Sequence, residues 1–565
     1  MNPFDICKPE ETSLKSFFLG PQSENKHFIQ NEILKILNHC WQWRRTTYPE
    51  DGVSITHEEQ LEPLFVDKIH STKQHVDELL ELFSQELPKF SPRYMGHMFS
   101  EISMPALLGH LVALLHNPNN VSRESSWVGV DLELEAVKEL CKMIGYPESS
   151  IGHFTSGGTI ANFEAFIRAK NKWLQILYSN KDNDLSFNDA CYIQGSSSLN
   201  FSPSEIEVYK HIKQKYKKEY DGAKLIVPSS KHYSWSKAAS IFGIGESNLI
   251  SVELNKFGQL CVKDLQKQID RCLENQTPIL AIVSVLGTTE LGSIDPIDEI
   301  QSVINGYKKN YNYTFWHHID AAYGGFFASL KDAGFFNISK TRALQAIQHS
   351  TSITIDPHKL GYVPYASGTF LCKEKEDYFN HEISAPYVDF QQKKDLGPYT
   401  LEGSRPATGA ASMFMTAKCI GLNENGYGQI LKRTVHVKNE FENQCREKHT
   451  PLAFVKTIDT NITGFAVIKN CKKLSEVNHM TSLLQSHCLS YEKHKKPYYF
   501  SKTKLGKNYK NLIENFCLQN KLDQDEEHLN LMRMTFMNPF SISKNSKTNH
   551  INGVVDYLAS IIQTL

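Results

Sequence analysis

The sequence lacks the long apolar segments of membrane and exported proteins. Its longest apolar run, PILAIVSVLG at 278–287, is about half as long as a membrane-spanning helix must be, so we expect no contact with a membrane. The N-terminal segment MNPFDICKPEETSLKSFFLG mixes acidic and basic residues where a secretory signal would place an apolar core. These absences predict a soluble protein of the cytoplasm.

The sequence also lacks a charge excess and a cysteine motif. Its 61 lysines and arginines balance 62 aspartates and glutamates, for a formal net charge of -1, so nothing indicates a nucleic-acid partner. The 12 cysteines include no CxxC pair, which argues against a zinc ribbon or a thioredoxin-type redox site. We expect free thiols, as is usual in a reducing compartment.

With 565 residues, the chain exceeds what one hydrophobic core usually supports. Apolar residues at spacings of three and four in EILKILNHCW and VDELLELFSQEL predict helices between 26 and 90. We therefore expect an N-terminal helical arm or dimerisation segment at 1–108. A large α/β domain should follow at 109–424, and a small α+β domain at 425–565.

The central region alternates helical patterns with short, continuously apolar runs, which are typical of parallel strands covered on both faces. These runs are KLIVP (224–228), PILAIVSVLG (278–287), YTFWHHID (313–320) and SITIDP (352–357). The polar stretch at 180–220 is expected to be a surface insertion. Beyond 425, GFAVIKN (464–470) and LMRMTFMN (531–538) alternate, which favours half-exposed antiparallel strands.

A glycine-rich turn precedes a strong helical pattern in FTSGGTIANFEAFIRAK (154–170). Such a turn presents backbone N–H groups and the positive end of a helix dipole to an anion, so Gly157, Gly158 and Thr159 are candidates for a phosphate site. The same residues also make an ordinary helix start capped by Thr159.

An acidic residue, Asp320, ends the apolar strand in HHIDAAYGGFF (317–327). A carboxylate there is costly to desolvate unless a cation or several donors face it. The alternative is an N-cap for the next element. A metal site formed with His317 and His318 is disfavoured, because adjacent residues on a strand point to opposite faces.

A lysine, Lys359, follows His358 in the otherwise apolar or turn-forming segment SITIDPHKLGYVPYASGTFL (352–371). Desolvation would lower the pKa of such a lysine and make its neutral amine nucleophilic toward an aldehyde. The alternative is a lysine at a strand edge whose amine reaches water.

Taken in chain order, the glycine turn, His232 in HYSWSKAA, Asp320 and Lys359 resemble the group II pyridoxal-dependent amino-acid decarboxylases. The resemblance runs from about residue 93 to the MNPF at 537–540. Bacterial tyrosine decarboxylases are the most similar members, through RYMGHMFSE (93–101), NPNNVSRESS (117–126) and LEGSRPATGAAS (401–412). The resemblance implies an α/β fold of type I, like aspartate aminotransferase, with a mostly parallel central sheet.

The resemblance also assigns roles around a cofactor, pyridoxal 5′-phosphate. It implies that Lys359 bonds covalently to the cofactor aldehyde, that Asp320 pairs with the ring nitrogen and that His232 stacks on the ring. The other residues implied to contact the cofactor are Gly157, Gly158, Thr159, Ser352 and His358 at the phosphate, Ala322 beside the ring, and Thr288 near the ring hydroxyl or the substrate carboxylate.

The reaction implied is decarboxylation of an L-amino acid, an aromatic one such as tyrosine, to carbon dioxide and a primary amine. A decarboxylase for glutamate or aspartate, or a carbon–carbon lyase of the sphingosine-phosphate type, are the alternatives. His97 is the candidate substrate contact, and Phe99, Trp127 and Tyr94 are candidates for apolar walls. Arg93 and Arg123 are available for an acidic side chain.

Family members usually form homodimers that share their active sites, so the helical arm and the stretch around Ser404 are expected at a dimer contact. Decarboxylation also returns a proton to Cα, and that donor must be shielded from water. The resemblance implies Tyr387, in the polar loop SAPYVDFQQKKDLG (384–397), as this donor, with Tyr399 as the poorer candidate.

Overall fold

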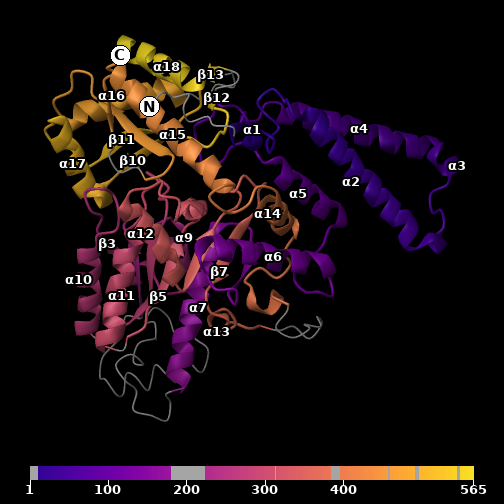
Figure 1. Cartoon of the computed structure of the whole chain (residues 1–565), viewed down its shortest axis with the longest axis horizontal. Helices are drawn as coiled ribbons and strands as arrows, with labels where there is room; N and C mark the ends of the chain where they lie inside the picture. The colour runs from indigo at the N-terminus through magenta and orange to yellow at the C-terminus, as the bar shows by residue number, and fades with distance from the viewer. Residues whose placement is uncertain are drawn as a thin grey trace.

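The fold is described from a computed structural model, which covers residues 10–179, 223–275, 277–311, 313–383, 395–455, 459–489, 496–543 and 547–565. The polar insertion expected at 180–220 and the candidate Tyr387 lie outside these residues. Figure 1 shows a helical arm, a large α/β region and a C-terminal α+β region.

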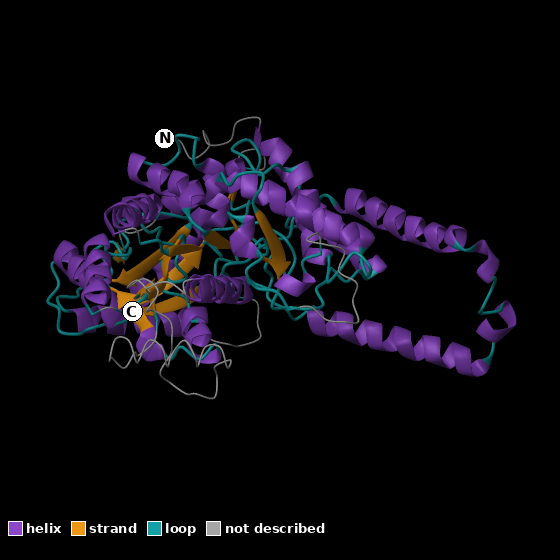
Figure 2. Ribbon diagram, turned by 90° about the horizontal axis from the view of Figure 1, so that it is seen from below, coloured by secondary structure: helices purple, strands orange, loops and turns teal. Residues whose placement is uncertain are grey.

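The N-terminal arm consists of two long helices, α2 (Lys26–Thr47) and α4 (Pro63–Phe83), preceded by the short α1 (Glu10–Lys15). Figures 1 and 2 show both long helices extending away from the rest of the chain. Their connection contains α3 (His57–Gln60), which starts at a capping box formed by Thr56 and Glu59. The helices predicted between 26 and 90 are confirmed.

Two helices join the arm to the large region, α5 (Met104–His116) and α6 (Trp127–Ile144). Helix α5 packs on α14 (Thr408–Cys419) at Gly109, where a Cβ atom would lie 2.6 Å from the carbonyl oxygen of Ala411. Glycine therefore permits the close approach of these two helices.

The large region is built on a seven-stranded sheet in the order β1-β7-β6-β5-β4-β2-β3. Its strands are β1 (Ile151–Thr155), β2 (Lys224–Pro228), β3 (Leu249–Val252), β4 (Ile279–Val285), β5 (Trp316–Asp320), β6 (Ser352–Ile355) and β7 (Gly368–Cys372). All run parallel except β7, which is antiparallel to β1 and β6. The mostly parallel sheet is confirmed, although β1, β3 and β7 were not predicted.

Helices cover both faces of this sheet, so β4 and β5 are buried along their whole length. These helices are α7 (Gly158–Ser179), α9 (Ser234–Ile241), α10 (Val262–Glu274), α11 (Ile297–Tyr311), α12 (Ile338–Ala346) and α13 (Lys375–Tyr378). Two apolar cores result, one of which includes residues of β4 and β2 from both faces of the sheet. The predicted strands are continuously apolar, rather than alternating, because helices cover both faces of the sheet.

The C-terminal region is an antiparallel sheet in the order β10-β11-β9-β8, with helices on both faces. Its strands are β8 (Leu452–Phe454), β9 (Ile462–Val467), β10 (Ser501–Leu505) and β11 (Leu529–Thr535), and its helices α15 (Tyr427–Glu447), α16 (Leu474–Leu489), α17 (Lys510–Asn520) and α18 (His550–Thr564). A small ribbon pairs β12 (Ile542–Ser543) with β13 (Thr548–Asn549).

The expected half exposure of β9 and β11 is wrong. Every residue of β9 is buried, because Phe465 faces one apolar core, with α15 and α18, and Ala466 faces another, with α17. Short 3-10 helices complete the fold at Pro49–Asp51, Glu246–Asn248, Gly324–Leu330, Ile347–His349, Gly397–Tyr399 and Lys507–Tyr509.

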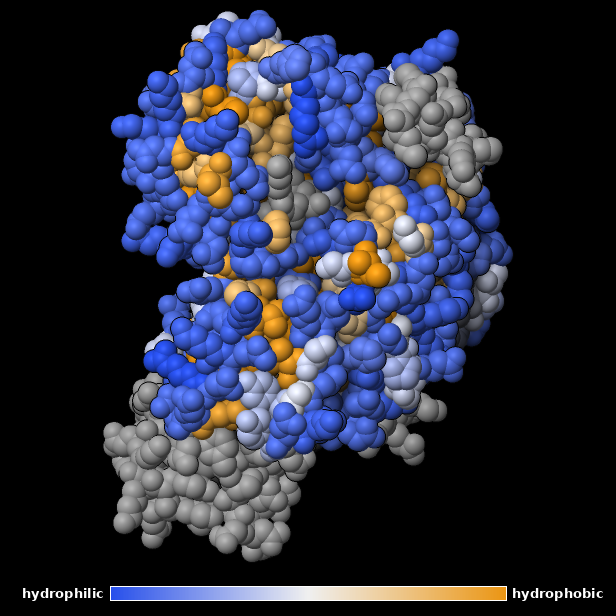
Figure 3. Space-filling view, turned by 60° about the vertical axis from the view of Figure 1, so that its left-hand side comes forward, coloured by the Kyte–Doolittle hydropathy of each residue, from blue (hydrophilic) through white to orange (hydrophobic). Residues whose placement is uncertain are grey.

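The surface and the thiols carry few further signals. The face in Figure 3 is mostly hydrophilic, with small apolar patches. Within the described ranges, no helix combines the length and apolarity that crossing a bilayer requires. The described cysteines are free thiols, as predicted.

Candidate active site

A cavity of about 320 Å³ lies at the carboxyl ends of the parallel strands. Val285 at the end of β4, Asp320 at the end of β5 and Asp356 just after β6 line it, together with the start of α7. Ligands of α/β sheets bind at this edge, because loops and helix N-termini converge there. The fold therefore gathers Gly157, Asp320 and Lys359 into one site.

The glycine turn forms one wall of the cavity. Helix α7 begins at Gly158, so the positive end of its dipole and its first N–H groups face the cavity. A Cβ atom at Gly158 would lie 2.8 Å from Asp356 Oδ2 and 3.0 Å from Ala322 Cβ, so a side chain is excluded. A Cβ atom at Gly157 would lie 3.5 Å from His358 Cε1. This wall suits an anion, as the sequence predicted for Gly157, Gly158 and Thr159.

Asp320 is nearly buried, with 5% of its surface exposed. Its Oδ2 accepts hydrogen bonds from Asn162 Nδ2 at 2.8 Å and Trp235 Nε1 at 3.2 Å, and its Oδ1 accepts from Ala322 N at 3.4 Å. Several donors thus face the carboxylate, which offsets the cost of burying it. Neither Asn162 nor Trp235 was predicted, because each comes from a helix remote in sequence.

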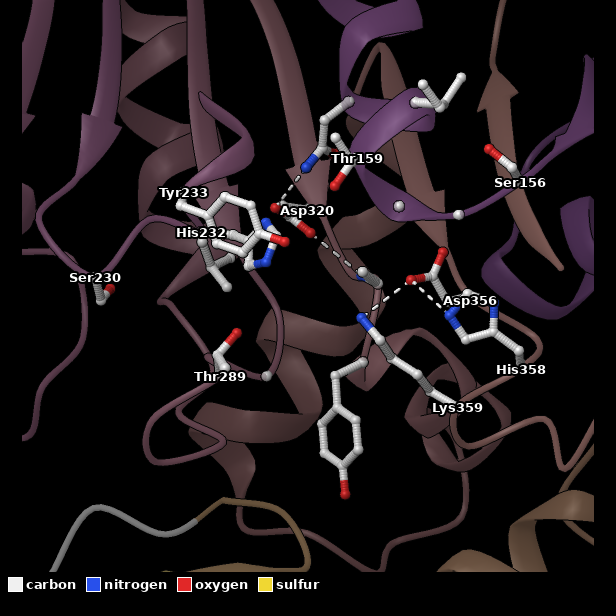
Figure 4. Close-up of a pocket in the computed structure, with 18 residues that line it drawn as sticks. Ser156, Thr159, Ser230, His232, Tyr233, Thr289, Asp320, Asp356, His358 and Lys359 are labelled. Atoms are coloured by element: carbon white, nitrogen blue, oxygen red, sulfur yellow. Dashed lines mark hydrogen bonds and ion pairs between the residues drawn. The ribbon is translucent and has the colours of Figure 1, made fainter. Parts of the chain in front are cut away.

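Lys359 enters the cavity beside a carboxylate that the sequence reasoning missed. Its Nζ lies 3.0 Å from Asp356 Oδ2, and His358 Nε2 lies 3.5 Å from the same oxygen (Figure 4). Asp356 belongs to the DPHK motif already quoted, three residues before the lysine, so the i,i+3 spacing was the available signal. In this arrangement Asp356 holds the amine inside the cavity.

His232 and Asp320 lie close together in the cavity (Figure 4). The Nδ1 atom of His232 is 2.9 Å from Ser234 Oγ and accepts from Ser234 N at 3.3 Å. Burial lowers the pKa of His232, while the charge of Asp320 opposes that shift. A neutral ring with its proton on Nε2 follows, which suits stacking on a flat cofactor.

His358 forms the opposite wall. Its Nδ1 accepts from Ser367 N at 3.1 Å, and its ring stacks on Tyr365 with centroids 4.0 Å apart. Burial lowers the pKa of His358, an effect that Asp356 opposes.

Two predicted cofactor contacts are not in the cavity. Ser352 begins β6 and so lies at the end of the strand remote from the cavity, where its buried Oγ bonds to Trp316 and His318. The Thr288 side chain turns inward, and its Oγ1 accepts from Ser293 N at 3.0 Å. Its neighbour Thr289 lines the cavity instead. Sequence proximity did not reveal which end of a strand, or which of two threonines, faces the site.

The predicted substrate contacts lie outside the cavity lining. His97 is exposed, with its ring 5.9 Å from that of Phe99, and Phe99 lies 6.4 Å from Tyr365. Tyr94 stacks on Phe99 at 5.6 Å, so these aromatic rings lead outward from His358. Trp127 is 80% exposed at the start of α6 and is not among the lining residues that this chain supplies.

Of the two proton-donor candidates, only Tyr399 lies within the described residues. Tyr387 lies outside the described residues, so its role stays a prediction. Tyr399 is buried, packs edge-on against Phe379 at 4.7 Å and does not line the cavity.

The histidine pair before Asp320 points to opposite faces of β5, as expected. His317 bonds to Ser284 and Gln301, whereas His318 bonds to Ser352 and Asn162.

The donor set fits pyridoxal 5′-phosphate, with a helix N-terminus for phosphate, an amine for an aldehyde and a buried carboxylate for a pyridine nitrogen. Two buried polar atoms that line the cavity, Asp356 Oδ1 and Ser230 Oγ, have no hydrogen-bond partner among the described residues. Such atoms indicate a site for a polar ligand.

Comparison with known proteins agrees with this fit. The model of the pyridoxal-dependent decarboxylase conserved domain matches residues 59–202 and 203–466. L-tyrosine decarboxylase of Enterococcus faecium is 28% identical over 590 residues, covering 94% of this chain and 95% of that protein. L-tyrosine decarboxylase of Levilactobacillus brevis is 32% identical over 468 residues, covering 74% and 73%.

A solved structure, that of mouse CSAD in its apo form, has the same fold at 18% identity, with a TM-score of 0.65 over 95% of this chain and 99% of that one. On the family match and the sequence relatives, the chain belongs to the pyridoxal-dependent decarboxylase family, with pyridoxal 5′-phosphate as its cofactor.

Proposed function

We propose that this decarboxylase acts on an aromatic L-amino acid, L-tyrosine foremost, and releases carbon dioxide and tyramine. The observation that carries the proposal is the charge of the cavity: among its described lining residues, Lys359 is the only lysine or arginine. That amine serves the cofactor, so no cation in this lining remains for an acidic side chain. The tyrosine decarboxylases among the relatives support the same choice.

The two arginines considered for an acidic substrate are engaged elsewhere. Arg93 lies over the ring of Tyr498 at 5.2 Å and donates to the carbonyl oxygen of Pro497 at 3.1 Å. Arg123 pairs with Asp131 at 2.6 Å. Neither lines the cavity. A glutamate or aspartate decarboxylase would need a cation that these positions do not supply.

A third arginine suits the carboxylate that every amino-acid substrate carries. Arg533 on β11 is 5% exposed, and its Nε and Nη2 atoms have no hydrogen-bond partner in the part of the chain that is described. Arg533 is not itself a lining residue, but it lies within electrostatic range of Tyr323, which lines the cavity. We therefore place the substrate α-carboxylate near Arg533, because leaving its buried donors unpaired is costly.

Aromatic rings support the choice of side chain. Tyr365, Phe99 and Tyr94 form a series of ring contacts that starts at His358 in the cavity wall. Aromatic rings pack favourably against one another, so this series favours an aromatic substrate. A carbon–carbon lyase for a phosphorylated lipid would need a second basic site, and the described lining holds one lysine only.

In the reaction, bound pyridoxal 5′-phosphate supplies an electron-poor ring that accepts the electron pair of the broken Cα–carboxylate bond. Asp320, whose Oδ2 accepts hydrogen bonds from Asn162 and Trp235, would face the ring nitrogen and hold a proton there. Lys359 would provide the amine that attaches the cofactor, and His232 would pack against its ring. On the resemblance alone, Tyr387 is proposed to return the proton to Cα.

We further propose that the chain works as a homodimer with shared active sites. The arm exposes large apolar side chains along both helices, among them Trp41 (53%), Leu64 (75%) and Leu80 (64%). Exposed apolar surface of this extent is unfavourable for a monomer in water. A second copy of the chain, seated on the arm, would bury it.

A substrate panel tests the proposed activity. Purified enzyme with added cofactor is incubated with L-tyrosine, L-DOPA, L-glutamate, L-aspartate or L-histidine, and carbon dioxide and amine are measured. We expect the highest kcat/KM with tyrosine or DOPA; preference for glutamate or aspartate would refute the choice of substrate. Lys359→Ala is the control, since it should lose both activity and the cofactor absorbance that borohydride abolishes in the parent.

A further inference from the structure

One buried asparagine is hydrogen-bonded both to a proposed cofactor contact, Asp320, and to Ser234, which is the hydrogen-bond partner of a second proposed contact, His232. Asn162 lies one turn into α7 and is 1% exposed. Its Nδ2 donates to Asp320 Oδ2 at 2.8 Å and to Ser234 Oγ at 3.0 Å, which uses both amide hydrogens. Asn162 is therefore bonded to the carboxylate assigned to the ring nitrogen and to the neighbour of His232.

The bond to Ser234 extends to His232. Because Ser234 Oγ accepts from Asn162, its own hydrogen is available for His232 Nδ1 at 2.9 Å. The backbone N–H of Ser234 donates to the same Nδ1 at 3.3 Å, so this nitrogen is an acceptor. The proton of neutral His232 then sits on Nε2, and the bond from Asn162 to Ser234 Oγ orients the Ser234 hydroxyl toward the same acceptor nitrogen.

The oxygen of that amide is fixed by two donors on its other side. Asn162 Oδ1 accepts from Thr354 Oγ1 at 2.9 Å and lies 3.2 Å from His318 Nε2. A flipped amide would set its oxygen against the Asp320 carboxylate and its NH₂ group against these donors. Only one orientation satisfies every partner.

His318 can donate from Nε2 because its other nitrogen is an acceptor. The indole N–H of Trp316, which can only donate, bonds to Ser352 Oγ at 2.9 Å, and Ser352 Oγ lies 2.8 Å from His318 Nδ1. The Ser352 hydroxyl hydrogen therefore points to Nδ1. Burial lowers the pKa of His318 to about 3, so the ring stays neutral with its proton on Nε2.

We propose that Asn162 is a positioning residue that couples Asp320 to His232 and holds both in the orientation that the cofactor requires. The hydrogen-bond chain runs in one direction, from Trp316 through Ser352 and His318 to Asn162. In this chain of hydrogen bonds, Ser352 links Trp316 to His318, a role remote from the proposed phosphate site. The inference concerns the cofactor shared by the family, so it stands apart from the identity of the substrate.

The dissociation constant of pyridoxal 5′-phosphate is the test, measured by absorbance titration of cofactor-depleted, full-length protein. Asn162→Ala should raise this constant about 10- to 100-fold, the effect of losing a hydrogen bond to a charged group. It should also shift the absorbance maximum of the bound cofactor, which a purely structural role would not change. Asn478→Ala is the matched control, because Asn478 is 4% exposed and equally hydrogen-bonded, but remote from the cavity.

A substitution pair at His318 tests the direction of the chain. His318→Gln keeps an N–H group where Nε2 stands and should bind the cofactor within about threefold of the parent, whereas His318→Leu removes the donor and should weaken binding about tenfold or more. Ser234→Ala deletes only one oxygen atom, so it keeps the test decisive if Asn162→Ala does not fold. It should raise the constant about 3- to 10-fold.

Three results would overturn the inference. They are an unchanged dissociation constant and spectrum in Asn162→Ala or, where that variant does not fold, in Ser234→Ala; equal losses in His318→Gln and His318→Leu; and a loss in Asn478→Ala as large as in Asn162→Ala. Because no substrate is added, failure of tyrosine decarboxylation would leave these readings unaffected.

Discussion

Replacing Asp320 by asparagine is the sharpest test of the electron-accepting site. The side chain keeps its shape, and its amide oxygen would still accept from Asn162 and Trp235, as Oδ2 does now at 2.8 and 3.2 Å. The NH₂ group would then stand where Oδ1 stands and face the ring nitrogen. It would offer a donor where the protonated ring needs an acceptor.

The size of the effect follows from that exchange. A hydrogen bond to a charged group contributes about 1.5–3 kcal/mol, and about 1.4 kcal/mol corresponds to a factor of ten. Asp320→Asn should therefore raise the cofactor dissociation constant about 10- to 100-fold. At saturating cofactor, it should lower kcat by at least as much, because the unprotonated ring accepts electrons poorly.

Cofactor titration and carbon dioxide release at saturating cofactor measure the two effects separately. Asp377→Asn is the matched control, since Asp377 is also nearly buried and pairs with Lys172 at 2.6 Å, yet does not line the cavity. Parent-like kcat in Asp320→Asn, or an equal loss in Asp377→Asn, would refute the assignment of Asp320 to the ring nitrogen.

Three further predictions concern other parts of the chain. Tyr387→Phe should lower amine yield while sparing cofactor binding, whereas Tyr399→Phe should leave amine yield unchanged. Equal yields in the two variants, measured by chromatography, would move the donor role elsewhere. Burial raises the pKa of Glu101 to about 7 from its ordinary 4.5, so the folded chain binds the extra proton and loses stability as pH rises from 4.5 through 7. Glu101→Gln should then be more stable than the parent by on the order of 2–3 kcal/mol at pH 8 and similar to it at pH 4.5, which urea unfolding at both values would check. Leu80→Asp on the arm should shift the light-scattering mass toward one chain, whereas Leu518→Asp, at an even more exposed site on α17, should not; a monomeric parent would contradict the proposed dimer.

The sequence predicted most of the parallel sheet and the two residues on which the site depends. Continuous apolar runs located β2, β4, β5 and β6, because strands buried on both faces leave no polar alternation. Asp320 and Lys359 were recognisable because a carboxylate and an amine are costly at the ends of such strands. Strand β7 was missed, since GTFLC has only five residues and follows directly on the turn-forming segment that carries Lys359.

The remaining errors have one physical source, which is that contacts remote in sequence decide them. Asn162 lies 158 positions from the carboxylate it donates to, and nothing in its own segment marks that partner. The half-exposed strand expected at 464–470 was wrong because a second layer of helices covers it. The family resemblance implied that Ser352 contacts the phosphate, but Ser352 begins β6, so the length of that strand separates it from the end that lines the cavity.

The single reversed strand, β7, has a mechanical consequence. Because it runs against β6, the loop that carries Lys359 leaves the sheet and returns to it at the same edge, and Gly368 pairs there with Thr155, just before the glycine turn. A Cβ atom at Gly368 would lie 2.5 Å from the Cα of Gly157. The glycine turn and the loop that carries Lys359, about two hundred residues apart along the polypeptide, are thus held against each other by this strand pairing. A methyl group added at Gly368 would displace both of them.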